Sequence, residues 1–178
     1  MKRVLVLLAV LLMGIGSLSF ADSFLQLSLT PEIALRPRPE RIKGLTIGIW
    51  GENPQNALAI GIIQGAPGDS SGFSWAVINY AGNYTGVQWG GINYNSRSFT
   101  GWQSGFINYT DGRTSGLQTG TVNYASRLKG VQIGLLNYAD RVDTGLQLGM
   151  INVIPQNEVL SGLPRQLSPA MVFANWSF

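Results

Sequence analysis

The nine Asp and Glu residues are the main candidates for acid–base chemistry in this sequence, because the chain has no histidine and no cysteine. A Ser-His-Asp triad needs an imidazole, and zinc sites are built chiefly from His and Cys. Asp140 and Asp143 are the closest pair of carboxylates, but Arg141 stands between them in a polar stretch typical of a solvated turn. No Gly-Lys-Ser/Thr phosphate-binding motif is present. The sequence therefore predicts no catalytic residue, no metal site and no cofactor, and we expect the protein not to be an enzyme.

Two groups of side chains could instead bind a ligand. Basic residues recur in the polar linkers, at Arg97, Arg113, Arg127 and Arg141. If the linkers stack, these residues form a basic stripe suited to an anionic glycan or lipid. Otherwise they are solvated turn residues that pair with neighbouring Asp side chains. Trp89 and Trp102 are expected on one strand face, where they could stack against a sugar, pack within the protein or face lipid.

The spacing of the remaining polar residues is that of a repeat. The phrase Gly-x-Gln-x-Gly-x-x-Asn begins at glycines spaced 14 or 15 residues apart, namely Gly72, Gly86, Gly101, Gly116, Gly130 and Gly145. Asn always stands seven residues after the opening glycine, at Asn79, Asn93, Asn108, Asn123, Asn137 and Asn152. Gln stands two residues after it, at Gln88, Gln103, Gln118, Gln132 and Gln147. All length differences fall in the linkers, so these Asn and Gln residues are predicted to be structural positions of regular elements joined by turns.

The repeated elements are expected to be strands. A helix with a glycine every four residues loses about 1 kcal/mol at each one relative to Ala. Alternation instead places Val131, Ile133, Leu135 and Asn137 on one face of a strand, with Gln132 and Gly134 on the other. Two degenerate units begin at Gly44 and Ala57, so the repeats span about 44–153. With amphipathic strands at Leu25–Leu29 and at residues 170–178, the all-β chain has about ten strands.

This array of Gly-x-Gln-x-Gly-x-x-Asn units resembles a family of exported bacterial surface-repeat proteins. The resemblance covers roughly Phe24 to Phe178, with departures at Ser74, where Gln is usual, and at Val153, where Tyr is usual. It implies a cell-envelope protein and supplies no catalytic residue.

The expected architecture is a closed antiparallel up-and-down barrel, and the alternative is a β-solenoid. A C-terminal Phe178 with apolar residues at alternate positions resembles the assembly signal of outer-membrane barrels, and an even number of strands suits them. The two long connections, Pro31–Lys43 and Ile154–Ser168, would lie on the same side of such a barrel. In a solenoid, each repeat is one coil, and like residues stack into Gln and Asn ladders.

The N-terminus indicates export. Lys2 and Arg3 precede a short apolar run, and Ser19-Phe20-Ala21 suits a cleavage site, so residues 1–21 are predicted to be a signal peptide and 22–178 a single domain. Loss of Lys2 and Arg3 reduces the 12 basic residues to ten, against nine acidic ones, which is no nucleic-acid signature.

We therefore expect an exported, non-catalytic protein at the outer membrane or cell surface of a Gram-negative-type bacterium, with a structural or surface-interaction role. Its expected partners are outer-membrane lipid and the barrel-assembly machinery, and no specific ligand is indicated. The alternative is a secreted β-solenoid module that binds an anionic glycan or lipid.

Overall fold

The chain is all-β, as predicted. The computed structural model describes residues 23–157 and 170–178, and none of these is helical. Its β elements are β1 (Ser23–Ser28), β2 (Ile42–Glu52), β3 (Asn56–Val153) and β4 (Ala170–Ser177), joined in one sheet in the order β1-β2-β3-β4. The predicted signal peptide lies outside the described residues.

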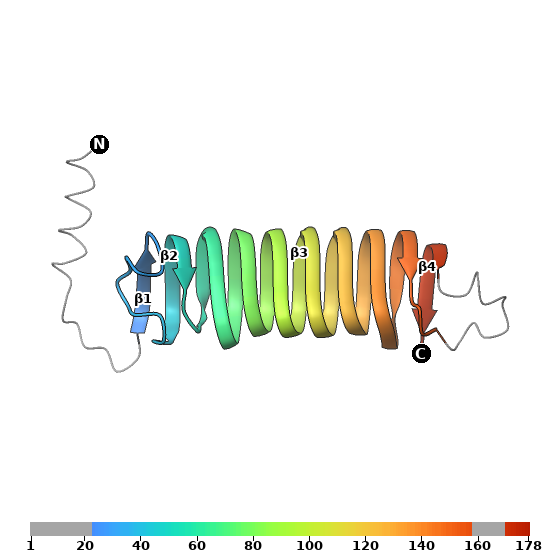
Figure 1. Ribbon diagram of the computed structural model, residues 1–178, viewed down its shortest axis with the longest axis horizontal. Coiled ribbons are helices and arrows are strands. Elements are labelled where there is room, and N and C mark those ends of the chain that lie inside the picture. The colour runs from blue at the N-terminus through green and yellow to red at the C-terminus, as the bar shows by residue number, and fades with distance from the viewer. Residues whose placement is uncertain (1–22, 158–169) are drawn as a thin grey trace.

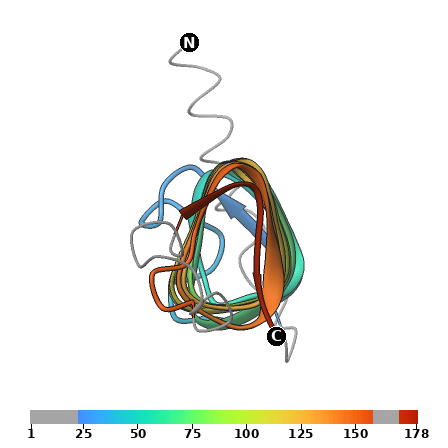
Figure 2. The same ribbon diagram turned by 90° about the vertical axis from the view of Figure 1, so that its right-hand side faces the viewer.

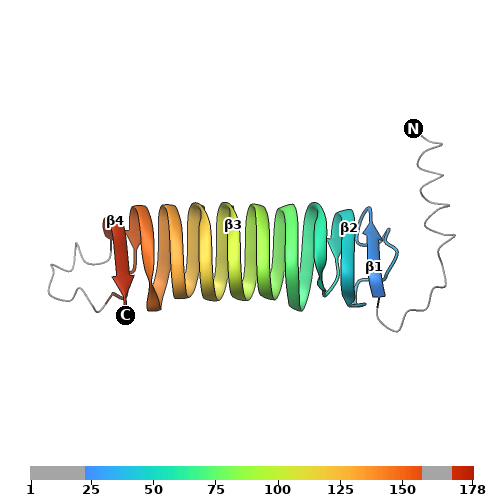
Figure 3. The ribbon, with the colours of Figure 1, turned by 180° about the vertical axis from the view of Figure 1, so that it is seen from behind.

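The long element β3 is a strand that winds repeatedly around one axis. In Figure 1 its coils follow one another from the N-terminal end to the C-terminal end with even spacing, and Figure 3 shows the same regularity from behind. Viewed along the axis, successive coils superpose as nested rings (Figure 2). The pairing is parallel, because β2 lies on β3 with Leu45 beside Leu58 and Ile47 beside Ile60. Each coil therefore lies on the preceding one in the same direction.

The prediction of a closed antiparallel barrel was wrong. The sheet does not close on itself, β1–β2 and β2–β3 are parallel, and antiparallel pairing of named strands occurs only between β3 and β4. The expected count of about ten separate strands is not confirmed, because the chain runs through β3 without interruption. Gly at the opening of each unit allows the chain to turn a corner where a hairpin was expected. The expectation of barrel-assembly machinery as a partner depended on that closed barrel.

The opening glycines explain how the coils approach one another. Gly72, Gly86, Gly101, Gly116 and Gly130 all have φ between 119° and 141°, a backbone conformation that side chains disfavour. A Cβ on Gly116 would also collide with the carbonyl oxygen of Gly101, one coil earlier. The close backbone contact thus requires glycine at this position.

Alternation is broken between the Gln and the Asn of each coil. In the coil that begins at Gly130, Gln132 and Asn137 are both fully buried, although they stand five positions apart and regular alternation would place them on opposite faces. Leu135 and Leu136, which stand between them, both face outward. The expectation that Gln and Asn lie on opposite strand faces was therefore wrong, since the strand must bend to close each coil and does so at this pair of residues.

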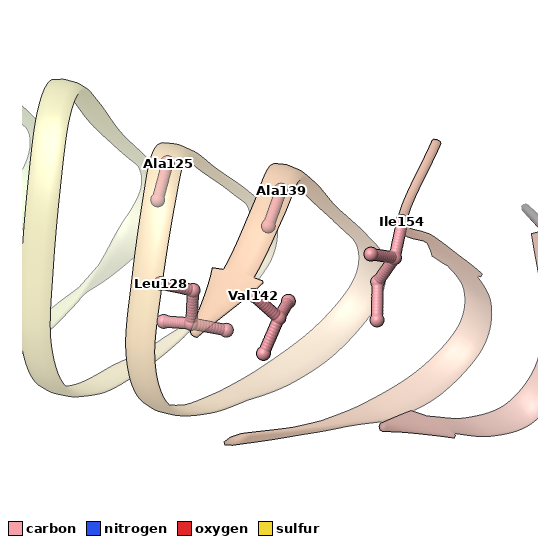
Figure 4. Packing of buried hydrophobic residues seen from close by; sticks show 5 residues of the cluster. All are labelled: Ala125, Leu128, Ala139, Val142 and Ile154. Atoms are coloured by element: carbon pink, nitrogen blue, oxygen red, sulfur yellow. The ribbon is translucent and has the colours of Figure 1, made fainter. Parts of the chain in front are cut away.

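The interior of the coil has a polar side and an apolar side. The polar side holds the repeated Gln and Asn residues, whereas the apolar side holds two clusters. One cluster joins Ala66, Ala81, Tyr84 and Phe99, with the two rings stacked at a centroid distance of 6.4 Å. The other stacks Ala125, Leu128, Ala139, Val142 and Ile154 inside consecutive coils (Figure 4).

Side-chain amides hold the N-terminal connection against the first coils. Asn53 donates to the carbonyl oxygens of Pro37 and Glu40 at 2.8 and 3.1 Å. Gln26 donates to the Asn53 side-chain oxygen at 2.7 Å and to the carbonyl of Arg36 at 2.9 Å. This loop lies beside the coil and does not extend its axis (Figure 2).

At the other end, β4 covers the last coil. It pairs antiparallel with Gly145–Val153, and the pairing has an irregularity between Gly149 and Asn152. Phe173, opposite Gly149, has a φ of 71° and a side chain that is 79% exposed. Asn175 is fully buried and accepts a hydrogen bond from Asn157 at 2.8 Å, so β4 closes the polar interior.

Candidate binding surfaces

The repeated Gln residues form one continuous ladder inside the coil. Each side-chain amide donates to the Gln oxygen of the preceding coil, with distances of 3.0, 2.8, 2.7 and 2.8 Å along the series Gln88, Gln103, Gln118, Gln132 and Gln147. From Gln118 onward, the same amide nitrogen also donates to a carbonyl in its own coil, such as that of Tyr124 at 3.2 Å. Both amide protons are then used.

The repeated Asn residues form a second ladder that points the other way. Each amide donates at 2.8 Å to the Asn oxygen of the following coil, along Asn79, Asn93, Asn108, Asn123, Asn137 and Asn152. Each also donates to a carbonyl in that next coil, as Asn108 does to Thr119 at 2.9 Å. Ser74, which stands where Gln is usual, donates to Asn79 at 2.6 Å and so satisfies the first oxygen of the ladder.

The two ladders are structural and closed to ligands. Their Asn and Gln side chains are at most 1% exposed. Satisfied hydrogen bonds remove most of the cost of burying these amides, and they fix which residues of neighbouring coils must face each other. Binding must therefore use the outer surface.

A column of tyrosine rings runs along that surface. Tyr94, Tyr109, Tyr124 and Tyr138 stack in sequence with centroid distances of 5.6, 4.5 and 5.6 Å. Parallel coils place all four tyrosines on one side of the solenoid. We call these four rings the tyrosine column.

Three of the four predicted arginines come together beside this column. Arg113, Arg127 and Arg141 lie on consecutive coils, and all reach Asp143, with N–O distances of 2.6, 3.8 and 3.7 Å respectively. Their side chains remain half exposed or more. We call these three residues the arginine cluster. They border a shallow depression of about 460 Å³, which Asp140 and Gln156 also line.

Arg97 does not join the arginine cluster. It precedes the buried Phe99 by two residues, whereas each cluster arginine directly precedes a buried residue of its coil, as Arg127 precedes Leu128. The Arg97 guanidinium lies instead beside Gly82. The predicted basic stripe of four arginines is therefore a cluster of three.

The arginine cluster has a net positive charge. The three guanidinium groups face Asp143 and Asp140, and the Asp140 carboxylate accepts a hydrogen bond from the Tyr124 hydroxyl at 2.9 Å. The hydrogen bond from Arg113 lowers the pKa of Asp143, with further lowering by the charges of Arg127 and Arg141. The single carboxylate of Asp143 is thus an internal counter-ion that three cations share.

Trp89 and Trp102 also lie together, on the outside of neighbouring coils. Their rings stack at 6.2 Å with an interplanar angle of 29°, and both remain exposed. The Trp102 indole N–H donates to Thr119 at 2.9 Å. They face a different side of the coil from the arginine cluster, so a single small ligand would not contact both groups.

Sequence reasoning expected the linker arginines to pair partly with Asp140, Asp143 and Asp111, but it did not predict that three of them share Asp143. It also did not predict the tyrosine column on one side. The Tyr that follows Asn in most coils was the available signal for the column, but its meaning depended on strand direction. In the described parts of the chain no three His, Cys, Asp or Glu side chains gather as metal ligands. Over the same residues, no helix has the length and apolar character needed to cross a membrane.

Comparisons of this chain with family models, curated proteins and solved structures gave no match.

Proposed function

We propose that this chain is an exported, non-catalytic interaction module of the bacterial cell envelope, at the outer membrane or cell surface, that binds anionic groups of a glycan or lipid. The observation that supports the proposal is the convergence of Arg113, Arg127 and Arg141 on the single carboxylate of Asp143. Guanidinium groups pair strongly with phosphate and carboxylate through their planar fork of N–H donors.

A ligand anion would compete with Asp143 for these guanidinium groups. One carboxylate cannot neutralise three cations, and the half-exposed arginine side chains can turn toward a ligand in the depression. The cluster spans consecutive coils, so it suits a repeating anion such as a glycan or a row of lipid headgroups. The predicted export and the resemblance to surface-repeat proteins support the envelope location.

The test measures binding of two soluble polymers, inorganic polyphosphate and polygalacturonate, by titration calorimetry. Arg127→Gln should weaken binding about fivefold to tenfold, because it removes the middle charge of the cluster. Arg97→Gln removes the same charge outside the cluster and is the matched control. It should leave the affinity close to that of the wild type.

Asp143→Asn gives the opposite expectation. Without the internal counter-ion, the three guanidinium groups lose their competitor, and polymer affinity should rise. Equal losses in Arg127→Gln and Arg97→Gln would show non-specific charge attraction and contradict the proposed site. No polymer binding by the wild type or by Asp143→Asn would contradict the proposed function.

A further inference from the structure

One side of the solenoid is largely apolar, with Ser104, Thr119 and Thr121 as its polar positions. We define the outer apolar face as the second, fourth, sixth and seventh residues of each coil between residues 44 and 151, counted from the opening Gly or Ala57. No charged residue occupies any of these positions. The sixth residues include Ile49, Ile62, Val77, Phe106, Leu135 and Met150, and each of these side chains is at least half exposed.

This face is large for a surface that meets water. Stacked strands lie about 4.8 Å apart and rise about 3.3 Å per residue, so the face measures roughly 34 Å by 16 Å. A footprint on the order of 500 Å² of nearly continuous apolar surface is at the upper end for a soluble monomer, and such patches mark interaction sites.

A groove of about 500 Å³ crosses the face. Its lining consists of Ile60, Gly61, Trp75, Ala76, Val77, Trp89, Gly90, Gly91 and Phe106. The Trp75 and Phe106 side chains are 56% and 73% exposed. No charged side chain lines the groove, so its surface suits contact with a hydrocarbon chain.

The border of the face has the residues of a membrane interface. The tyrosine column follows directly after the buried Asn of each coil, at the edge of the outer apolar face. Across that column lies the arginine cluster, connected through the hydrogen bond from Tyr124 to Asp140. Aromatic residues with polar tips favour the headgroup region of a bilayer, and basic residues favour anionic headgroups.

We infer that the outer apolar face seats the solenoid on a lipid leaflet that contains anionic lipid, with the tyrosine column at the headgroups and the arginine cluster at their phosphates. A second copy of the chain is less suitable, because the charge of the adjacent arginine cluster is basic on both copies. The choice of headgroup rests on the proposed function, whereas contact of the apolar face with hydrocarbon does not.

Vesicle flotation tests this arrangement with the full mature chain. The probes are vesicles of phosphatidylcholine alone and of phosphatidylcholine with a quarter phosphatidylglycerol. We expect the wild type to float with both, and more strongly with the second. Tryptophan emission should shift to the blue and be quenched by brominated acyl chains, because Trp75, Trp89 and Trp102 lie on the face.

Phe106→Glu places a charge on the face and should reduce binding to both vesicles at least tenfold. Thr100→Glu adds the same charge at an exposed position outside the face and is the matched control. It should reduce binding less than twofold. Circular dichroism on both variants shows whether the coil remains folded.

Three results would overturn the inference. The first is absence of wild-type binding to either vesicle. The second is binding that brominated lipid does not quench. The third is a wild-type dimer in sedimentation equilibrium that Phe106→Glu dissociates, since a second copy would then cover the face. If only the proposed anion site were wrong, Arg127→Gln would bind polyphosphate like the wild type, and the wild type would still float with the vesicles. That result would therefore contradict the proposed function and leave the membrane inference standing.

Discussion

Tyr84 is a buried hydroxyl at the centre of an apolar cluster. Its side chain is 1% exposed, and its oxygen has no hydrogen-bond partner among the described residues. An unsatisfied buried polar group costs about 1–3 kcal/mol. Burial also raises the pKa of Tyr84 well above its ordinary value of 10.0.

Tyr84→Phe should therefore stabilise the protein by about 1 kcal/mol at neutral pH. The pKa of Tyr84 is higher in the folded state than in the unfolded chain. The free energy of unfolding is therefore unaffected by Tyr84 ionisation below about pH 10. It falls above that pH, because the unfolded chain then releases the Tyr84 proton first. Chemical unfolding at pH 8 and pH 11 should show a smaller loss of unfolding free energy in Tyr84→Phe than in the wild type. Equal losses would contradict this account.

The residue types indicated which side chains fill the interior, but not which side of the interior each one occupies. The fixed spacing of Gln88 and Asn93 marked both as structural, and the structure gives each a ladder partner. Their burial on the same side could not be predicted, because a regular alternating strand would separate them. The strand bends at the two residues before each Asn, and this bend brings Gln and Asn to the same side. The bend is needed because the strand must close each coil.

At the scale of elements, the coil is the unit of structure. Parallel and antiparallel stacking share the same alternation and the same repeat length, so the sequence indicated strands without fixing their direction. The decisive contacts join equivalent residues of neighbouring coils, such as Gly101 with Gly116 and Asn108 with Asn123. The same limit affected the arginines, since Arg97 and Arg113 have similar places in their linkers but different places on the coil.

Removal of one complete coil, residues 116–129, should leave a folded protein. Gln103 then meets Gln132 and Asn108 meets Asn137, so both ladders close again with one rung fewer. We expect a β circular-dichroism spectrum and cooperative unfolding at a lower denaturant midpoint. Removal of half a coil, residues 116–122, is the matched control. It shifts the ladders out of register and should abolish cooperative unfolding, and a folded half-coil variant would contradict the role given to the ladders.

At the scale of the whole molecule, polarity is distributed opposite to the usual pattern. The coil buries amides in ladders and presents much of its apolar surface outside, with the arginine cluster across the tyrosine column. The outer apolar face escaped prediction because its columns exist only once the coils are stacked. Individual apolar residues at the sixth position were visible in each repeat, but their alignment was not.

The structure at the ends of the solenoid determines whether the protein stays monomeric. β4 covers the edge at Gly145–Val153, which would otherwise offer unpaired backbone groups to another chain. Removal of residues 170–178 should cause association that increases with protein concentration in sedimentation velocity. A synthetic peptide of residues 170–178 should restore the monomer by pairing with the same edge. A truncated chain that stays monomeric at high concentration would show that β4 has no such protective role.

The opposite directions of the two ladders have an electrostatic consequence. Side-chain amides aligned head to tail add their dipoles, as peptide groups do in a helix. Here the dipoles of the Gln ladder point along the axis against those of the Asn ladder, so each added coil contributes two nearly cancelling vectors. The two ladders therefore add little net dipole along the axis as the solenoid lengthens. Repeat number can change in such a chain without the ladders making either end an electrical pole.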